Sequence, residues 1–175
     1  MKNKKILVFG FKPYGRYKTN ISEIIVNKLH NKERIEKIIL PIDFDRDIII
    51  KKIKETKPDI ILGLSQHPRA GKIRIERKAK NIIKLKKEKK SRSINKNAGE
   101  ALFVNLSIDK TKGTTTAYNV GTYVCNFTMY IIINYINKHN KNIKFAFLHI
   151  PKSYNVNKGM RIINKILDNS LLTSS

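Results

Sequence analysis

The chain has 175 residues, of which 41% are hydrophobic, and a formal net charge of +24 from 37 lysines and arginines against 13 acidic residues. This composition excludes a disordered chain, and the length fits a single domain over residues 1–175 with a sizeable core. No apolar run reaches the roughly 18 residues that a membrane span needs, and one cysteine excludes an intrachain disulfide. We therefore expect a cytoplasmic protein with a reduced thiol.

Elements in the first half of the chain alternate between strand and helix. Runs of β-branched and apolar residues predict strands, and apolar residues three or four positions apart predict helices. In chain order we expect a strand at 4–9, a Gly- and Pro-containing loop at 10–15, a helix at 23–30, a strand at 35–41, a helix at 43–56, a strand at 59–64 and a loop at 65–71. Asn20 or Ser22 is placed to cap the first helix.

The second half continues the alternation after one irregular stretch. Residues 72–81 are expected to form a strand with Ile73 and Ile75 on one side and Arg74 and Glu76 on the other. The polar residues 84–112 predict no regular element. The remaining expected elements are a strand at 114–120, a helix at 125–138, a strand at 143–149 and a helix at 157–167. This order predicts an α/β fold, a three-layer α/β/α sandwich with a mostly parallel, twisted central sheet.

The lone cysteine, Cys125, opens the expected helix at 125–138. A thiolate at a helix N-terminus is stabilised by the positive end of the helix dipole. A single cysteine is nevertheless more often a buried structural residue than a nucleophile. A catalytic role therefore needs partners nearby.

Candidate partners lie at the ends of other strands. Open α/β sheets bind ligands beyond the carboxyl ends of their strands, where the sequence places the loops 11–14 and 65–67, Cys125 and His149. A cysteine peptidase needs a thiolate, an imidazole and a third group that orients the imidazole. Cys125 and His149 supply the first two, and Glu76 is a candidate for the third.

Four sequence blocks carry a specific resemblance. They are Gly10-Phe11-Lys12-Pro13-Tyr14-Gly15, Gln66 with Ile75-Glu76-Arg77 ten residues further on, Gly121-Thr122-Tyr123-Val124-Cys125-Asn126, and Leu148-His149-Ile150-Pro151. In this order the blocks resemble pyroglutamyl peptidase I, a family of cysteine peptidases that remove N-terminal pyroglutamate (5-oxoproline) from peptides. The resemblance implies a catalytic triad in which Cys125 is the nucleophile, His149 the general base and acid, and Glu76 the residue that orients His149.

The resemblance also implies a substrate pocket and partners. Phe11 and Tyr14 would hold the lactam ring between aromatic faces, and Gln66 would recognise its polar groups. Tyr123 and Val124 would line the pocket beside the nucleophile. The implied partners are peptides with an N-terminal pyroglutamate and further copies of the chain in a dimer or tetramer. No cofactor and no metal are implied.

Two alternatives stay open. The chain could be a weak or inactive family member that binds pyroglutamyl peptides, since Lys78 and Lys80 stand where the family commonly has apolar residues. It could also be a nucleic-acid-binding domain that uses the basic block at 84–92. No aromatic residues interleave with this block, so the stacking platform of a single-strand binder is missing. We therefore expect neither nucleic acid nor a membrane as a partner.

Overall fold

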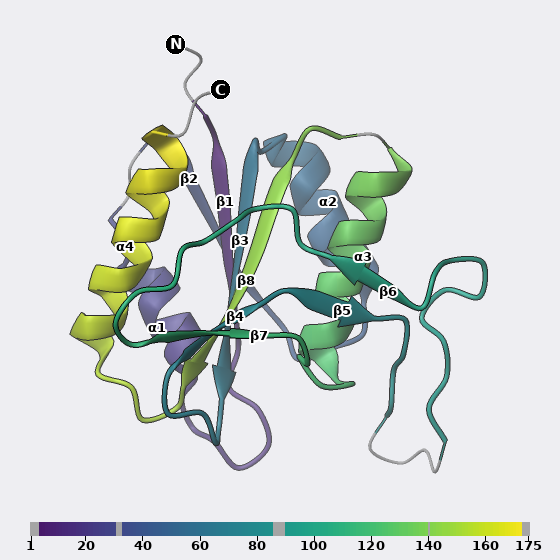
Figure 1. The fold of residues 1–175 in the computed structure, drawn as a ribbon, viewed down its shortest axis with the longest axis horizontal. Helices are drawn as coiled ribbons and strands as arrows, with labels where there is room; N and C mark the ends of the chain where they lie inside the picture. Colours follow the sequence, from purple (N-terminus) through teal and green to yellow (C-terminus); the bar gives the residue numbers. More distant parts are fainter. Residues whose placement is uncertain (1–3, 31–32, 86–89, 140, 173–175) are drawn as a thin grey trace.

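The computed structural model describes residues 4–30, 33–85, 90–139 and 141–172. In these ranges a central sheet lies between two pairs of helices (Figure 1). Helices α1 (Ile21–Lys28) and α4 (Val156–Leu172) cover one face, and α2 (Arg46–Thr56) and α3 (Val124–Lys138) cover the other. The predicted three-layer α/β/α arrangement is thereby confirmed.

The central sheet has six strands in the order β2-β1-β3-β8-β4-β7. Its neighbours are parallel except for β4 and β8, which run antiparallel, so the sheet is mostly parallel, as predicted. A separate two-stranded sheet joins β5 to β6. The strands are β1 (Ile6–Phe11), β2 (Ile35–Leu40), β3 (Ile60–His67), β4 (Ile73–Glu76), β5 (Lys78–Lys80), β6 (Ala101–Phe103), β7 (Thr114–Ala117) and β8 (Lys144–Pro151).

Alternate residues of the central strands point to opposite faces and build two cores. Phe9 and Phe147 belong to the core on the α2/α3 face, whereas Val8 and Leu148 belong to the core on the α1/α4 face. Gly63 lies between the two phenylalanine rings. A Cβ there would come within 2.4 Å of Phe9 and 2.5 Å of Phe147, so only glycine lets both rings pack over β3.

Two predicted segments differ from the structure near the carboxyl ends of strands. The expected loop at 65–71 is wrong at Ser65–His67, because these residues continue β3 by pairing with β8 from His149 to Pro151. The expected loop at 10–15 likewise starts too early, since Gly10 and Phe11 belong to β1. Pairing with a neighbouring strand extends each strand beyond its apolar run.

The expected single strand at 72–81 is also wrong. It divides at Arg77 into β4, which joins the central sheet, and β5, which joins β6. The Arg77 amide donates to the carbonyl of Ala117, while the Arg77 carbonyl accepts from the amide of Val104, so the chain changes partners at this residue. The strand β6 lies in the stretch for which the sequence predicted no element.

The basic block at 84–92 falls partly outside the described residues, which omit 86–89. Ile83 and Arg92, on either side of the gap, form an antiparallel bridge. Across the described ranges, no helix is both long and apolar enough to cross a membrane.

Candidate active site

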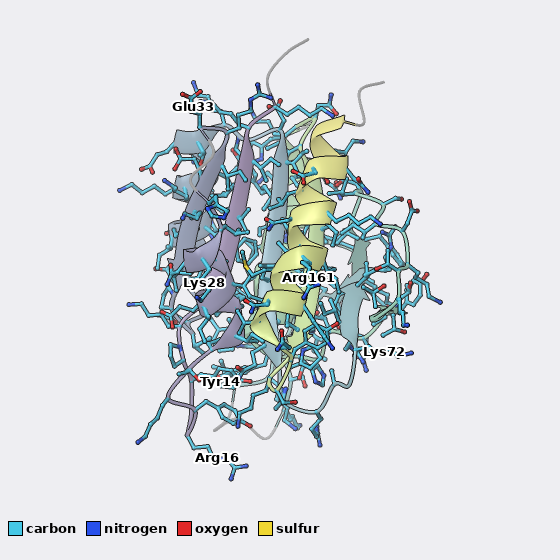
Figure 2. The ribbon with its side chains drawn as sticks, turned by 90° about the vertical axis from the view of Figure 1, so that its left-hand side faces the viewer. Tyr14, Arg16, Lys28, Glu33, Lys72 and Arg161 are labelled. Carbon is cyan, nitrogen blue, oxygen red and sulfur yellow. The ribbon has the colours of Figure 1, made fainter. Side chains whose placement is uncertain are left out.

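The elements that carry the predicted site residues meet at one end of the molecule. The carboxyl ends of β1, β3 and β8 and the start of α3 lie at the end opposite the chain termini (Figure 1). Figure 2 shows Tyr14 and Arg16, from the loop after β1, at that same end and far from Glu33. This is the edge at which parallel α/β sheets bind their ligands.

Three polar residues form one row across adjacent strands. Ser65 of β3 is the register partner of His149 of β8, and His149 is the register partner of Arg74 of β4. Register partners lie on the same face of a sheet, here the face covered by α3. Cys125, half-buried at the start of α3, faces this row, and its Sγ lies 3.0 Å from Ser65 Oγ.

A buried hydrogen bond joins the predicted base to the predicted acid. His149 Nδ1 donates to Glu76 Oε1 at 2.9 Å, and the two side chains are only 5% and 0% exposed. Donation from Nδ1 leaves the other ring nitrogen, Nε2, for proton exchange with a nucleophile. The structure thus brings together the three residues that the sequence named for catalysis.

The charges around this pair favour an ionised arrangement. Burial alone would lower the pKa of His149, but the charge and hydrogen bonding of Cys125, followed by those of Glu76, outweigh it and raise that pKa to about 9. Burial would raise the pKa of Glu76, but hydrogen bonds from His149 and Arg74 and their charges hold it below its ordinary value. A protonated His149 paired with an ionised Glu76 is therefore the favoured state at neutral pH.

The start of α3 supplies backbone donors beside the thiol. The first helical hydrogen bonds run from the amides of Phe127 and later residues, beginning with donation to the carbonyl of Tyr123. The preceding amides, including that of Cys125, have no acceptor within the helix. Gly121, with φ at 91°, turns the chain into this helix through a conformation that other residues adopt only with strain.

Two of the predicted substrate-binding residues lie close to the thiol. Burial, and then the charge of Cys125, raise the pKa of Tyr14 against a hydrogen bond from Gln66, so the phenol group of Tyr14 lies near the thiol. Tyr123 also acts on Tyr14 electrostatically, and its ring packs edge-on against Phe44 at 5.3 Å between centroids. No sequence pattern distinguished Phe44 as a residue of the site.

The other three predicted binding residues are more deeply placed. Phe11 and Val124 are each 1% exposed and belong to the core on the α2/α3 face. Gln66 points to the opposite face of β3, where its Oε1 accepts from the amide of Ile21 at the start of α1. Its buried Nε2 makes no close hydrogen bond within the described part of the chain, but the Gln66 side chain lies near enough to the Tyr14 phenol to act on it as a hydrogen-bond donor. The substrate contacts of these residues stay predictions.

Sequence reasoning missed three side chains that support the site. Arg74 Nε donates to Glu76 Oε1 at 2.8 Å, and Ser65 contacts the thiol. Asn126, fully buried and next to Cys125 in the chain, accepts from the amide of Lys80 at 2.8 Å and donates to the carbonyls of Lys80 and Ile82. The alternation of residues 73–76 had already placed Arg74 on the same side as Glu76.

A thiol at a helix N-terminus next to a buried imidazole–carboxylate pair is the arrangement of a cysteine hydrolase. The chain belongs to the pyroglutamyl peptidase family, since the model of that family matches residues 4–160. It is 31% identical to pyrrolidone-carboxylate peptidase 1 of Saccharolobus solfataricus, over 83% of this chain and 78% of that protein. It is 34% identical to the pyrrolidone-carboxylate peptidase of Thermoanaerobacter sp. strain X514, over 84% of this chain and 82% of the relative.

Solved structures share the fold. The pyrrolidone carboxyl peptidase from Thermococcus litoralis superposes with a TM-score of 0.85 at 22% identity, covering 96% of this chain and 93% of that one. Pyroglutamyl peptidase I from Bacillus amyloliquefaciens gives a TM-score of 0.86 at 21% identity, covering 98% and 96%. The α/β fold is therefore the fold of these peptidases.

Proposed function

We propose that this protein is a cysteine exopeptidase that hydrolyses the bond following an N-terminal pyroglutamyl residue. The observation that carries the proposal is the buried hydrogen bond between His149 and Glu76 beside Cys125, in a chain of the pyroglutamyl peptidase family. Cys125 is the nucleophile, and His149 is the general base and then the general acid. Glu76 orients the imidazole and stabilises its positive charge.

Substrate recognition follows from the chemistry of the lactam ring. The ring is flat and neutral and carries one N–H and one carbonyl, so aromatic faces and a few fixed hydrogen bonds suit it. Phe11 and Tyr14 supply the aromatic contacts, and Tyr123 and Val124 complete the wall beside the thiol. The buried Nε2 of Gln66 lies near the Tyr14 phenol and makes no close hydrogen bond among the described residues, which suits it to donate to the lactam carbonyl.

The first chemical step forms a thioester. The Cys125 thiolate attacks the pyroglutamyl carbonyl carbon, a C–S bond forms, and the negative charge passes to the carbonyl oxygen. The Cys125 amide at the start of α3 donates to this oxyanion. The His149 imidazolium then gives its proton to the leaving nitrogen, the C–N bond breaks, and the shortened peptide departs with a free amine.

The second step regenerates the enzyme. Neutral His149 takes a proton from a water molecule as the water oxygen attacks the thioester carbonyl. The C–S bond breaks and releases pyroglutamate, and the thiolate faces an imidazolium again. Throughout, Glu76 fixes the ring tautomer and stabilises the positive charge.

Hydrolysis of pyroglutamyl-aminomethylcoumarin tests the proposal. We expect the wild-type protein to release the fluorophore under reducing conditions and Cys125→Ser to lose this activity while keeping its circular dichroism spectrum. Alanyl-aminomethylcoumarin, which carries a free ammonium, is the control substrate and should not be cleaved, because burying an unpaired charge is costly. A folded wild-type protein with no activity across pH and temperature would overturn the proposal.

The proposal extends to assembly and location. The protein acts in the cytoplasm, where the half-buried Cys125 stays reduced, and it self-associates as a dimer or tetramer. A net charge of +24 opposes close approach of two copies, so salt should favour association. Light scattering over a salt series measures the mass, and a monomer at every salt concentration would contradict the assembly.

A further inference from the structure

One oxygen of the buried carboxylate receives two cationic donors. Glu76 Oε1 accepts from His149 Nδ1 at 2.9 Å and from Arg74 Nε at 2.8 Å. The Arg74 side chain is 27% exposed, whereas that of Glu76 is fully buried. The carboxylate is thus held between the imidazole from β8 and a guanidinium from its own strand.

The same guanidinium reaches the segment that leads to the nucleophile. Arg74 Nη2 donates to the backbone carbonyl of Asn119 at 3.0 Å. The Asn119 side chain in turn accepts from the amide of Gly121 at 3.3 Å and from Lys80 Nζ at 3.4 Å. Arg74 therefore connects the acid on β4 to the turn from which α3 and Cys125 begin.

We propose that Arg74 is a positioning residue of this peptidase, which orients Glu76 toward His149 and ties β4 to the turn at 119–121 before the nucleophile. The proposal rests on the function proposed above. Arg74 does not reach the reacting atoms, and it acts through Glu76 and Asn119. The planar guanidinium suits this role because Nε and Nη2 present parallel donors to two different acceptors.

The charges around the carboxylate determine what losing Arg74 would do. His149 from β8 and Arg74 act directly on Glu76. Cys125 from α3 acts on His149, and His67, at the end of β3, interacts with both His149 and Glu76 and has its own pKa lowered by burial. Without Arg74, only the imidazolium would favour the ionised form of the buried carboxyl. Glu76 would then become protonated at a higher pH. A protonated Glu76 has no negative charge with which to stabilise the imidazolium of His149.

Kinetics of Arg74→Met and Arg74→Lys across pH test this role. For Arg74→Met we expect kcat to fall about tenfold with KM within about twofold of wild type, and the acid midpoint of kcat/KM to rise by about 0.5–1 unit. Arg74→Lys keeps the positive charge but loses the two parallel donors of the guanidinium. Its acid midpoint of kcat/KM should stay near that of wild type, and its kcat should fall less than that of Arg74→Met. Arg161→Met, which removes an exposed arginine on α4, is the matched control and should leave both unchanged (Figure 2).

Separate results would overturn the two proposals. If Arg74→Met keeps the wild-type kcat and pH profile while Glu76→Gln loses activity, Arg74 has no positioning role and the proposed function stands. A lower melting temperature with an unchanged pH profile and kcat would also reject the role, since it would show only a structural contact. If Arg74→Met does not fold, a wild-type kcat in Arg74→Lys would reject the positioning role of Arg74. Full activity in Cys125→Ser would instead overturn the function.

Discussion

Replacing Glu76 by glutamine removes the negative charge from a fully buried carboxyl group and keeps its size. The amide oxygen can still accept from His149 Nδ1 and Arg74 Nε, so both orienting hydrogen bonds can survive. The opposite charge beside the imidazole is lost, however. At a separation near 4 Å and an effective dielectric constant of about 20, that charge is worth up to about 4 kcal/mol.

The loss of the carboxylate charge should appear in the alkaline limb of the profile of kcat/KM against pH. The carboxylate helps to raise the pKa of His149 to about 9, and removing it should lower that pKa by about 1–2 units, because the hydrogen bond remains. Leaving-group protonation requires the imidazolium, so the alkaline midpoint of kcat/KM should move down by the same amount. We also expect kcat/KM at its optimum to fall by a factor of about 10² to 10⁴.

The substitution should also destabilise the fold moderately. Glu76 Oε2 is buried with no partner among the described residues, and an amide nitrogen in its place would bury unpaired donors at a cost of about 1–3 kcal/mol. For a chain of this size that corresponds to a fall in melting temperature of about 2–12 °C. The protein should therefore stay folded at assay temperature, which allows its kinetics to be measured.

The assay is kcat/KM against pH with pyroglutamyl-aminomethylcoumarin, together with thermal unfolding. The matched control is Glu36→Gln, which removes a half-exposed carboxylate paired with Lys52 at 3.4 Å on the edge strand β2 and should change neither activity nor its pH profile. Wild-type kcat/KM in Glu76→Gln, or an alkaline midpoint that moves up, would refute the claim that the charge of Glu76 stabilises the imidazolium of His149.

Three further substitutions test neighbouring contacts. Ser65→Ala should lower kcat/KM by about tenfold, since a hydrogen bond to a charged sulfur contributes about 1.5 kcal/mol; an unchanged value would show that the hydroxyl does not stabilise the thiolate of Cys125. Asn126→Ala removes three hydrogen bonds to Lys80 and Ile82 and should cost about 2–4 kcal/mol in urea unfolding, which an unchanged midpoint would contradict. Gly63→Ala should destabilise by about 1–3 kcal/mol or more through the clash with two aromatic rings, and equal stability would refute that packing argument.

Local patterns in the sequence were sufficient to predict the layers and several elements of the site. The alternation of strands and helices predicted the α/β/α sandwich, and Asn20 caps α1 as expected, accepting from the amide of Ser22. The pattern at 73–76 placed Glu76 opposite the apolar Ile75. Such features depend on residues close together in the chain, which a single sequence displays directly.

Features that depend on distant partners could not be predicted in this way. Ser65 belongs to a strand only because β8, some 84 positions later, continues to pair with it. The break at Arg77 depends on acceptors and donors near 104 and 117. The Asn126 side chain binds the backbone of residues 80–82, and no local pattern identifies those acceptors.

The shared row of Ser65, His149 and Arg74 makes the reaction sensitive to strand alignment. Side chains alternate with a period of two, so a slip of one residue in β8 would turn His149 to the α1 side and away from Cys125. A misaligned molecule could keep much of its secondary structure and still lack a base. Only molecules whose central strands have paired correctly are therefore active. Specific activity after refolding would measure the yield of correctly aligned molecules.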